Sequence, residues 1–369
     1  MNKILLIILL ILNSPILVAQ DINLTSVDEF FRITSTLRQG KKINKEQWQQ
    51  FDNSSGYAIF SRNQNKFIIN TIKSSIYMVF GNENKATKDS ILNIPEEEIS
   101  KDKIKMLKKL ILTNFQDINE HYSSIKSFRD NYDFDSLLTK TVQRLSLFLC
   151  CDTLNSAIKL KPIYFFFFSS DGKDMEDALY IDFNLIYNMT EQQRINFLAH
   201  EFFHNYRSHF ENHEFNYKED LNFMLDMIQN EGIADQIDKY MGYKKYYSDI
   251  FKSPELAKIF TTLYDKAEDD IKQLQTIIVQ YSKNNIDKKT MIDKLLEVYK
   301  YNGHAIGFYM SNQIIKAGFK NEMIKSFYNP YEFYRLYNLA AYKNKTFILS
   351  DDFMFFLKSI TKDHYTQNQ

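Results

Sequence analysis

Two histidines one helical turn apart are the first candidates for chemistry in this sequence. His200, Glu201 and His204 form the pattern His-Glu-x-x-His. Residues four apart in a helix lie about 40° apart around the axis and about 6 Å along it, so both imidazoles can point at one metal ion. Glu201 lies about 100° around the axis from His200, beside such a metal rather than on it. A general base stands in this position when it takes a proton from a water molecule.

A third metal ligand is expected downstream, because a catalytic zinc ion binds three protein ligands and keeps a fourth position open. One known arrangement places a histidine six residues after the second one, but that position is Phe210, and His209 misses it by one. The other common arrangement uses a glutamate from a second helix and an acidic residue one turn later. Glu231 lies 27 residues after His204, and Asp235 follows Glu231 by one turn. A carboxylate at Asp235 can accept the second N–H of a ligand histidine and fix its orientation.

The combined pattern resembles the gluzincins, the thermolysin-like branch of the zinc metallopeptidases, over the segment from Pro162 to Tyr240. The resemblance implies roles for five residues: His200, His204 and Glu231 as zinc ligands, Glu201 as the general base, and Asp235 as the hydrogen-bonding partner of His200. The whole chain is similar to a bacterial family of zinc-dependent peptidases that share this core and have a helical amino-terminal region.

The resemblance also implies a fold that would position these residues. In gluzincins an antiparallel edge strand lines the substrate cleft, and Ala178–Tyr187, with its alternating apolar residues, is the candidate for it. Ile163–Phe168 is a second candidate strand, because it is a short apolar run that ends in turn-forming residues. We therefore expect an α+β fold that is predominantly α-helical, with a zincin-like core, a small antiparallel-edged sheet and a His-Glu-x-x-His helix.

Helical patterns occupy most of the remaining chain. A capping box at Thr190–Gln193 starts the helix that carries the two histidines. Other helices are predicted over residues 23–40, 45–51, 95–128 and 133–149, and over nearly all of the chain from 190 to 361.

A late helix carries a further candidate. Gly303 and Gly307 are four residues apart and are predicted to lie on one face of it. A glycine inside a helix costs about 1 kcal/mol relative to alanine, so we expect close packing against the metal-bearing helices. Gluzincins use a downstream histidine or tyrosine to stabilise the oxyanion, which makes His304 the first candidate and Tyr301 and Tyr309 the alternatives.

Charge and the amino terminus limit the partners and the compartment. The chain has 46 Lys and Arg against 46 Asp and Glu and no long basic run, so we expect no nucleic-acid partner. Residues 1–20 have the pattern of a signal peptide, and the apolar run Ile4–Leu12 is too short for the roughly 20 residues of a membrane span. We expect an exported protein, periplasmic or secreted, with no stable membrane span after cleavage. Cys150 and Cys151 are expected to be buried rather than bonded to each other.

The sequence thus predicts three segments: a signal peptide at 1–20, a helical region at 21–155 and a zincin-like catalytic region at 156–369. No linker separates the last two, so a single continuous domain over 21–369 is the alternative. The predicted function is that of a zinc metallopeptidase acting on peptides or proteins. Two alternatives stay open: a zincin-like binding or structural protein without activity, and a zinc hydrolase of a non-peptide amide or ester. Glu201 argues against the first, because a structural metal site needs no base. Asn230 is interpreted as a solvated or capping side chain, and His209 as solvent-facing.

Overall fold

The computed structural model describes residues 21–63, 66–95, 98, 102–149, 159–175, 177–210, 221–250 and 254–361. They divide into two compact units. The sheet unit contains residues 21–140 and 159–194, and the helical unit contains residues 141–149 and 195–361. The predicted signal peptide and the two cysteines lie outside the described residues. Among the described helices, none has the length and apolar character needed to span a membrane.

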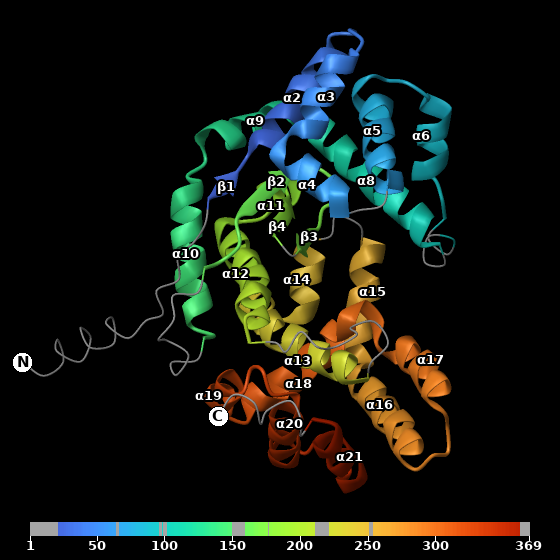
Figure 1. Ribbon diagram of the computed structural model, residues 1–369, viewed down its shortest axis with the longest axis vertical. Helices are drawn as coiled ribbons and strands as arrows, with labels where there is room; N and C mark the ends of the chain where they lie inside the picture. Colours follow the sequence, from blue (N-terminus) through green and yellow to red (C-terminus); the bar gives the residue numbers. More distant parts are fainter. Residues whose placement is uncertain are drawn as a thin grey trace, which may run out of the picture. The chain divides into compact units, whose positions relative to one another are not determined.

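The sheet unit contains one small mixed sheet with the strand order β1-β2-β4-β3 (Figure 1). Its strands are β1 (Ile22–Asn23), β2 (Ile163–Phe166), β3 (Gly172–Asp174) and β4 (Leu179–Asp182). The pairs β1–β2 and β2–β4 are parallel, and β3 pairs antiparallel with β4. The edges of the sheet are therefore β1 and β3, and β4 lies inside it.

The prediction of an edge strand over Ala178–Tyr187 is wrong in two respects. Only Leu179–Asp182 is a strand, and it is not at an edge; the chain continues as α11 (Phe183–Asn188). The side chain of Asp182 starts α11 by accepting a hydrogen bond from the backbone N–H of Leu185 at 3.0 Å. Every residue from Ala178 to Ile186 is buried, so the alternation of polar and apolar types does not mark one solvated face here.

The helices of the sheet unit agree with most of the sequence predictions. Within the predicted helix over 95–128, the described residues from 102 onward form two helices, because the chain breaks at His121. The first of the two begins where Asp102 caps the backbone N–H of Ile104 at 2.9 Å. The helices are α2 (Thr25–Arg38), α3 (Lys45–Asn53), α4 (Ser55–Asn63), α5 (Lys66–Phe80), α6 (Lys85–Leu92), α8 (Lys103–Glu120) and α9 (Tyr122–Asn131). Phe30 of α2 packs on Phe167, at the end of β2, with 4.3 Å between ring centroids.

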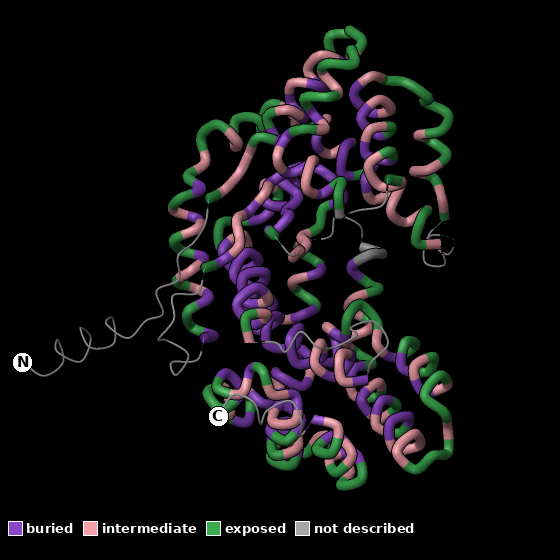
Figure 2. The backbone as a smooth tube through the Cα atoms, in the orientation of Figure 1, coloured by how far each residue is buried: buried purple, intermediate pink, exposed green. Residues whose placement is uncertain are grey.

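Two of the unit boundaries fall within helices, α10 (Phe134–Ser146) and α12 (Glu191–Ser208). The rest of the helical unit consists of α13 (Leu221–Asp238), α14 (Tyr243–Ile250), α15 (Pro254–Asp265), α16 (Ala267–Ser282), α17 (Lys288–Val298), the 3₁₀ turn Lys300–Gly303, α18 (His304–Lys316), α19 (Lys320–Lys325), α20 (Pro330–Asn344) and α21 (Asp351–Thr361). Every residue of α13 from Ile228 onward is buried, which places this helix in the core of its unit (Figure 2).

Two glycines allow α13 and α18 to touch through their backbones. A Cβ on Gly232 would lie 2.5 Å from the carbonyl oxygen of Gly307, and a Cβ on Gly307 would lie 2.2 Å from the carbonyl oxygen of Ile228. The predicted tight packing of α18 is confirmed against α13, the helix that carries Glu231, and these contacts do not involve α12.

Gly303 differs from the prediction, because it precedes α18 instead of lying inside it. Its φ is +78°, and Tyr301 and Asn302 before it also have left-handed φ values of 48° and 55°. Three successive left-handed residues turn the chain sharply, and His304 is the first residue of α18 after them.

Candidate metal centre

Helix α12 presents the two predicted histidines to one point. Its capping box is confirmed: the backbone N–H of Thr190 donates to Gln193 Oε1 at 2.9 Å, and the backbone N–H of Gln193 donates to Thr190 Oγ1 at 3.3 Å. One turn apart within the helix, His200 and His204 point the same way, with 3.0 Å between their Nε2 atoms. Glu201 is also buried. Two ring nitrogens that face each other at this distance need a proton or a metal ion between them.

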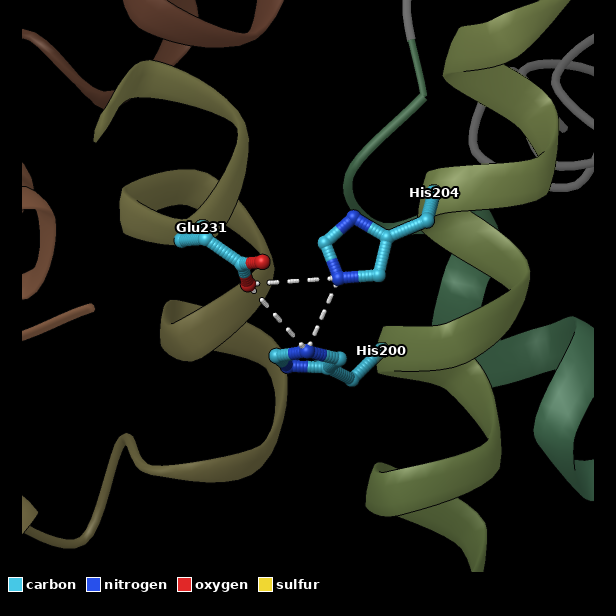
Figure 3. Close-up of side chains that lie close together, drawn as sticks. All are labelled: His200, His204 and Glu231. Atoms are coloured by element: carbon cyan, nitrogen blue, oxygen red, sulfur yellow. Dashed lines mark hydrogen bonds and ion pairs between the residues drawn. The ribbon is translucent and has the colours of Figure 1, made fainter. Parts of the chain in front are cut away.

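Glu231 of α13 completes the group (Figure 3). Its Oε2 lies 3.3 Å from Nε2 of His204 and 3.7 Å from Nε2 of His200. Ligands of a tetrahedral zinc at the usual bond lengths of about 2.0–2.1 Å lie about 3.3 Å apart, so the three observed separations bracket the zinc geometry. Oε2 of Glu231 is buried and has no hydrogen-bond partner among the described residues, as expected of an oxygen reserved for a cation. The residues therefore fit a zinc ion.

The Nδ1 atom of each histidine in this group contacts a side chain of α13. The Nδ1 of His200 lies 3.1 Å from Oδ1 of Asp238, whereas Asp235 is 3.7 Å away. The Nδ1 of His204 lies 3.0 Å from Oδ1 of Asn230. Asn230 is 5% exposed, so its interpretation as a solvated or capping side chain is wrong. A carbonyl or carboxylate oxygen on Nδ1 fixes the tautomer that leaves Nε2 free to bind a metal.

Asp235 pairs with His304 rather than with His200. The Nδ1 of His304 lies 3.0 and 3.1 Å from the two carboxylate oxygens of Asp235 and 3.4 Å from Oε2 of Glu231. Asp238, one turn beyond Asp235, is the closer partner of His200, because α13 turns that later position toward α12. The structure thus brings His200, His204, Glu231, Asp235 and His304 together, and it assigns the hydrogen bonds differently from the prediction.

The charged side chains of this group shift one another's pKa values strongly. Burial lowers the pKa of His204, but the neighbouring carboxylates, Glu231 first among them, outweigh burial and raise this pKa to about 10. Burial raises the pKa of Glu231, but the three histidines, His304 first, lower it to about 2. A divalent cation bound here would replace the proton of the imidazole and keep the carboxylate charged.

One known protein family matches this chain over most of its length. Residues 48–346 match the profile of the family described as "Putative zinc dependent peptidase (DUF5700)". The chain belongs to this family. No curated protein and no solved structure matches the chain.

Zinc is the cofactor that this family membership implies, and the group of His200, His204 and Glu231 has the donor atoms for it. The family is described by its dependence on zinc and by peptidase activity, so peptides are the substrates that it implies.

Tyr301 and Tyr309, the two alternatives to His304, do not lie in the metal group. The hydroxyl of Tyr309 donates to Glu268 at 2.6 Å, and the half-exposed ring of Tyr301 packs on Phe260 with 4.7 Å between centroids. The structure gives His304 contacts with both carboxylates of the metal group, and it gives neither tyrosine such a contact among its described interactions. His209 is exposed, as expected, with Nδ1 2.8 Å from the carbonyl oxygen of Asn205.

Three residues of the centre were not predicted from the sequence: Asn230, Asp238 and Lys239. The signal for Asp238 is present, because residues 231, 235 and 238 follow the i, i+4, i+7 spacing of one helix face. Lys239 follows Asp235 by one turn and is buried, with its ammonium 2.6 Å from Asp235 Oδ1.

Proposed function

We propose that this protein is an exported zinc metallopeptidase of the gluzincin type. The observation that carries the proposal is the convergence of His200 Nε2, His204 Nε2 and Glu231 Oε2 within 4.8 Å of one another, with the glutamate oxygen buried and without a hydrogen bond among the described residues. Membership of a zinc-dependent peptidase family supports the substrate class.

In this proposal the side chains of α12 and α13 bind the metal, and Glu201 of α12 also transfers a proton. His200, His204 and Glu231 hold the zinc, which when bound polarises a carbonyl group and makes a water molecule more acidic. Glu201 takes the proton of that water and passes it to the leaving amine. Its place in α12, directly after His200, and its electrostatic effect on His204 support this role.

His304 is proposed to stabilise the negative oxygen that develops on the substrate carbonyl. Its Nδ1–H donates to Asp235 at 3.0 Å, which fixes the ring and favours its protonated form. When both ring nitrogens carry protons, Nε2–H is left to donate to the substrate oxygen. Asp235 is then the residue that orients His304.

The test replaces Glu201 by glutamine and compares it with Glu191→Gln. Glu191 starts the same helix, is exposed and pairs with Lys140, so its replacement controls for the chemical change alone. Purified proteins are incubated with a mixed peptide library, with and without a chelator, and zinc content is measured in parallel. We expect chelator-sensitive cleavage by the parent and by Glu191→Gln, and zinc without turnover in Glu201→Gln.

Other outcomes select the alternatives. Cleavage by Glu201→Gln at the parental rate contradicts the base assignment. Zinc without any cleavage in the parent indicates a binding or structural protein. Hydrolysis confined to non-peptide amides or esters indicates a different hydrolase. Export is tested separately by sequencing the amino terminus of the mature protein, which we expect to begin near residue 20, as the pattern of residues 1–20 indicates.

A further inference from the structure

Lys239 is a buried, positively charged residue that contacts the carboxylates next to the proposed metal centre. It follows the last residue of α13, and only 3% of it is exposed. Its Nζ lies 2.6 Å from Oδ1 of Asp235 and 3.1 and 3.0 Å from Oδ1 and Oδ2 of Asp238. The two carboxylates are buried as completely as the lysine. Lysine is almost never fully buried unless it is paired, so this ion cluster calls for an explanation.

Stability alone does not explain the cluster. Taking three charged groups out of water costs more than their attraction commonly returns, and buried ion pairs can often be replaced by apolar residues without loss. The ammonium is further enclosed by aromatic rings of α14, with Nζ 4.6 Å from the ring centroid of Tyr246 and 5.9 Å from that of Tyr247. These contacts hold the charge in one place and keep water away from it.

The same carboxylate oxygens that contact Lys239 also contact the histidines. Oδ1 of Asp238 lies 3.1 Å from Lys239 Nζ and 3.1 Å from His200 Nδ1. Oδ1 of Asp235 lies 2.6 Å from Lys239 Nζ and 3.0 Å from His304 Nδ1. One ammonium thus ends two chains of hydrogen bonds, one leading to a proposed zinc ligand and one to the proposed oxyanion group.

The lysine also stands where a second cation could otherwise bind. Two further groups of ligand atoms overlap the zinc group: His200 with Asp235 and Asp238, and Glu231 with Asp235 and His304. Both use Asp235, whose Oδ1 is the oxygen closest to the ammonium.

We propose that Lys239 is a positioning residue that acts as an internal cation: it fixes Asp235 and Asp238, and through them His200 and His304, and it limits the centre to a single zinc ion. The part of this inference that concerns zinc rests on the proposed function. Lys239 itself touches neither the metal nor the substrate; it acts through the two carboxylates.

The test compares Lys239→Met with Lys245→Met. Lys245 forms an exposed ion pair with Asp249 at i+4, also at 2.6 Å, so it provides the same chemical change in the same unit without burial. Zinc stoichiometry and affinity are measured by competition with a chelator, and the visible spectrum of the cobalt(II)-substituted protein reports the coordination geometry.

We expect one zinc per chain in the parent and in Lys245→Met. In Lys239→Met we expect zinc affinity to fall by about 10- to 100-fold, as for other residues that orient metal ligands, and the cobalt spectrum to change. In a peptide assay the loss should lie in kcat rather than KM. A folded Lys239→Met protein with parental zinc affinity and cobalt spectrum would overturn the proposal, and so would two zinc ions per chain in the parent.

A second variant covers the case in which Lys239→Met does not fold. Lys239→Arg keeps the charge but replaces a compact ammonium by a planar fork that cannot occupy the same point between both carboxylates. We expect this variant to fold, to bind zinc several-fold more weakly and to shift the cobalt spectrum; parental values for both quantities contradict the inference. The metal measurements do not require peptidase activity, so failure of the proposed function and failure of this inference are distinguishable.

Discussion

Replacing Gly307 by alanine tests whether the contact of α13 with α18 positions the metal centre. The new Cβ would lie 2.2 Å from the carbonyl oxygen of Ile228, which is 1.2 Å short of the 3.4 Å where ordinary van der Waals contact begins. The obstructing atom belongs to the backbone, so the helices must separate. Overpacking costs about 1–3 kcal/mol, and we take the upper end because no side chain can rotate away. Alanine regains about 1 kcal/mol of helix propensity, so the net loss in unfolding free energy is about 2 kcal/mol.

The same separation should damage the centre. His304 lies on α18 and Asp235 on α13, with 3.0 Å between Nδ1 and the carboxylate. Moving the helices apart by anything near 1.2 Å takes this contact beyond the roughly 3.2 Å limit of an N–H···O hydrogen bond. Peptide hydrolysis should therefore fall more than stability alone would explain.

The assay is denaturant unfolding at fixed zinc concentration, together with peptide hydrolysis by the folded protein. Gly318→Ala is the control, because Gly318 follows α18 and has a φ of +88°. Apart from Gly318 and its two chain neighbours, no described residue has a heavy atom within 4 Å of the point that a Cβ would occupy, so only backbone strain is expected there. The reasoning is refuted if Gly307→Ala is as stable as the parent, or more stable by the roughly 1 kcal/mol of helix propensity, with parental activity.

Two further predictions concern zinc and pH. Zinc added to the metal-free protein at 100 times its dissociation constant should raise the unfolding free energy by about 2.7 kcal/mol, and Glu231→Gln, which keeps the shape but loses the charge of a ligand, should remove most of this gain in a thermal shift assay. Burial raises the pKa of Asp182 to about 6 from an ordinary value of 3.8. The folded protein therefore binds this proton more tightly than the unfolded chain, so the contribution of Asp182 to stability is complete below about pH 4 and falls by up to about 3 kcal/mol as the pH rises through about 6. The difference in unfolding free energy between the parent and Asp182→Asn should vary with pH in this window, and a difference that is constant from about pH 4 to 7 contradicts the assignment.

The features of the site that could be predicted from the sequence are those set by residues close together in one helix. The capping box at Thr190 and the spacing of His200 and His204 are set within a few residues, and the structure reproduces both. Glu231 and Asp235 follow the same logic within α13. That α12 and α13 meet at one metal ion was predicted from the resemblance to the gluzincin pattern, because spacing within one helix says nothing about a second helix.

The sheet shows where local patterns are insufficient. Two of its four strands have two or three residues, too few for any periodicity to appear. In Ala178–Tyr187 the alternation of types is real, but strand β4 is buried on both sides. Asp182 predicts the end of the strand better than the alternation does, because aspartate is a preferred residue at the position before a helix. In the structure it accepts the backbone N–H of Leu185, three residues later.

The pairing of histidines with carboxylates depends on contacts between helices, and no spacing within one helix determines it. Residues 231, 235 and 238 share one face of α13, so the sequence alone allows either aspartate to serve either histidine. The backbone contact at Gly232 and Gly307 brings the start of α18 onto Asp235, which leaves Asp238 for His200. Because both aspartates then face inward, the cluster needs a counter-charge, and Lys239 supplies it from the next residue along the chain. The two glycines and the lysine are thus parts of one arrangement, and a change at either should be detected at both His200 and His304.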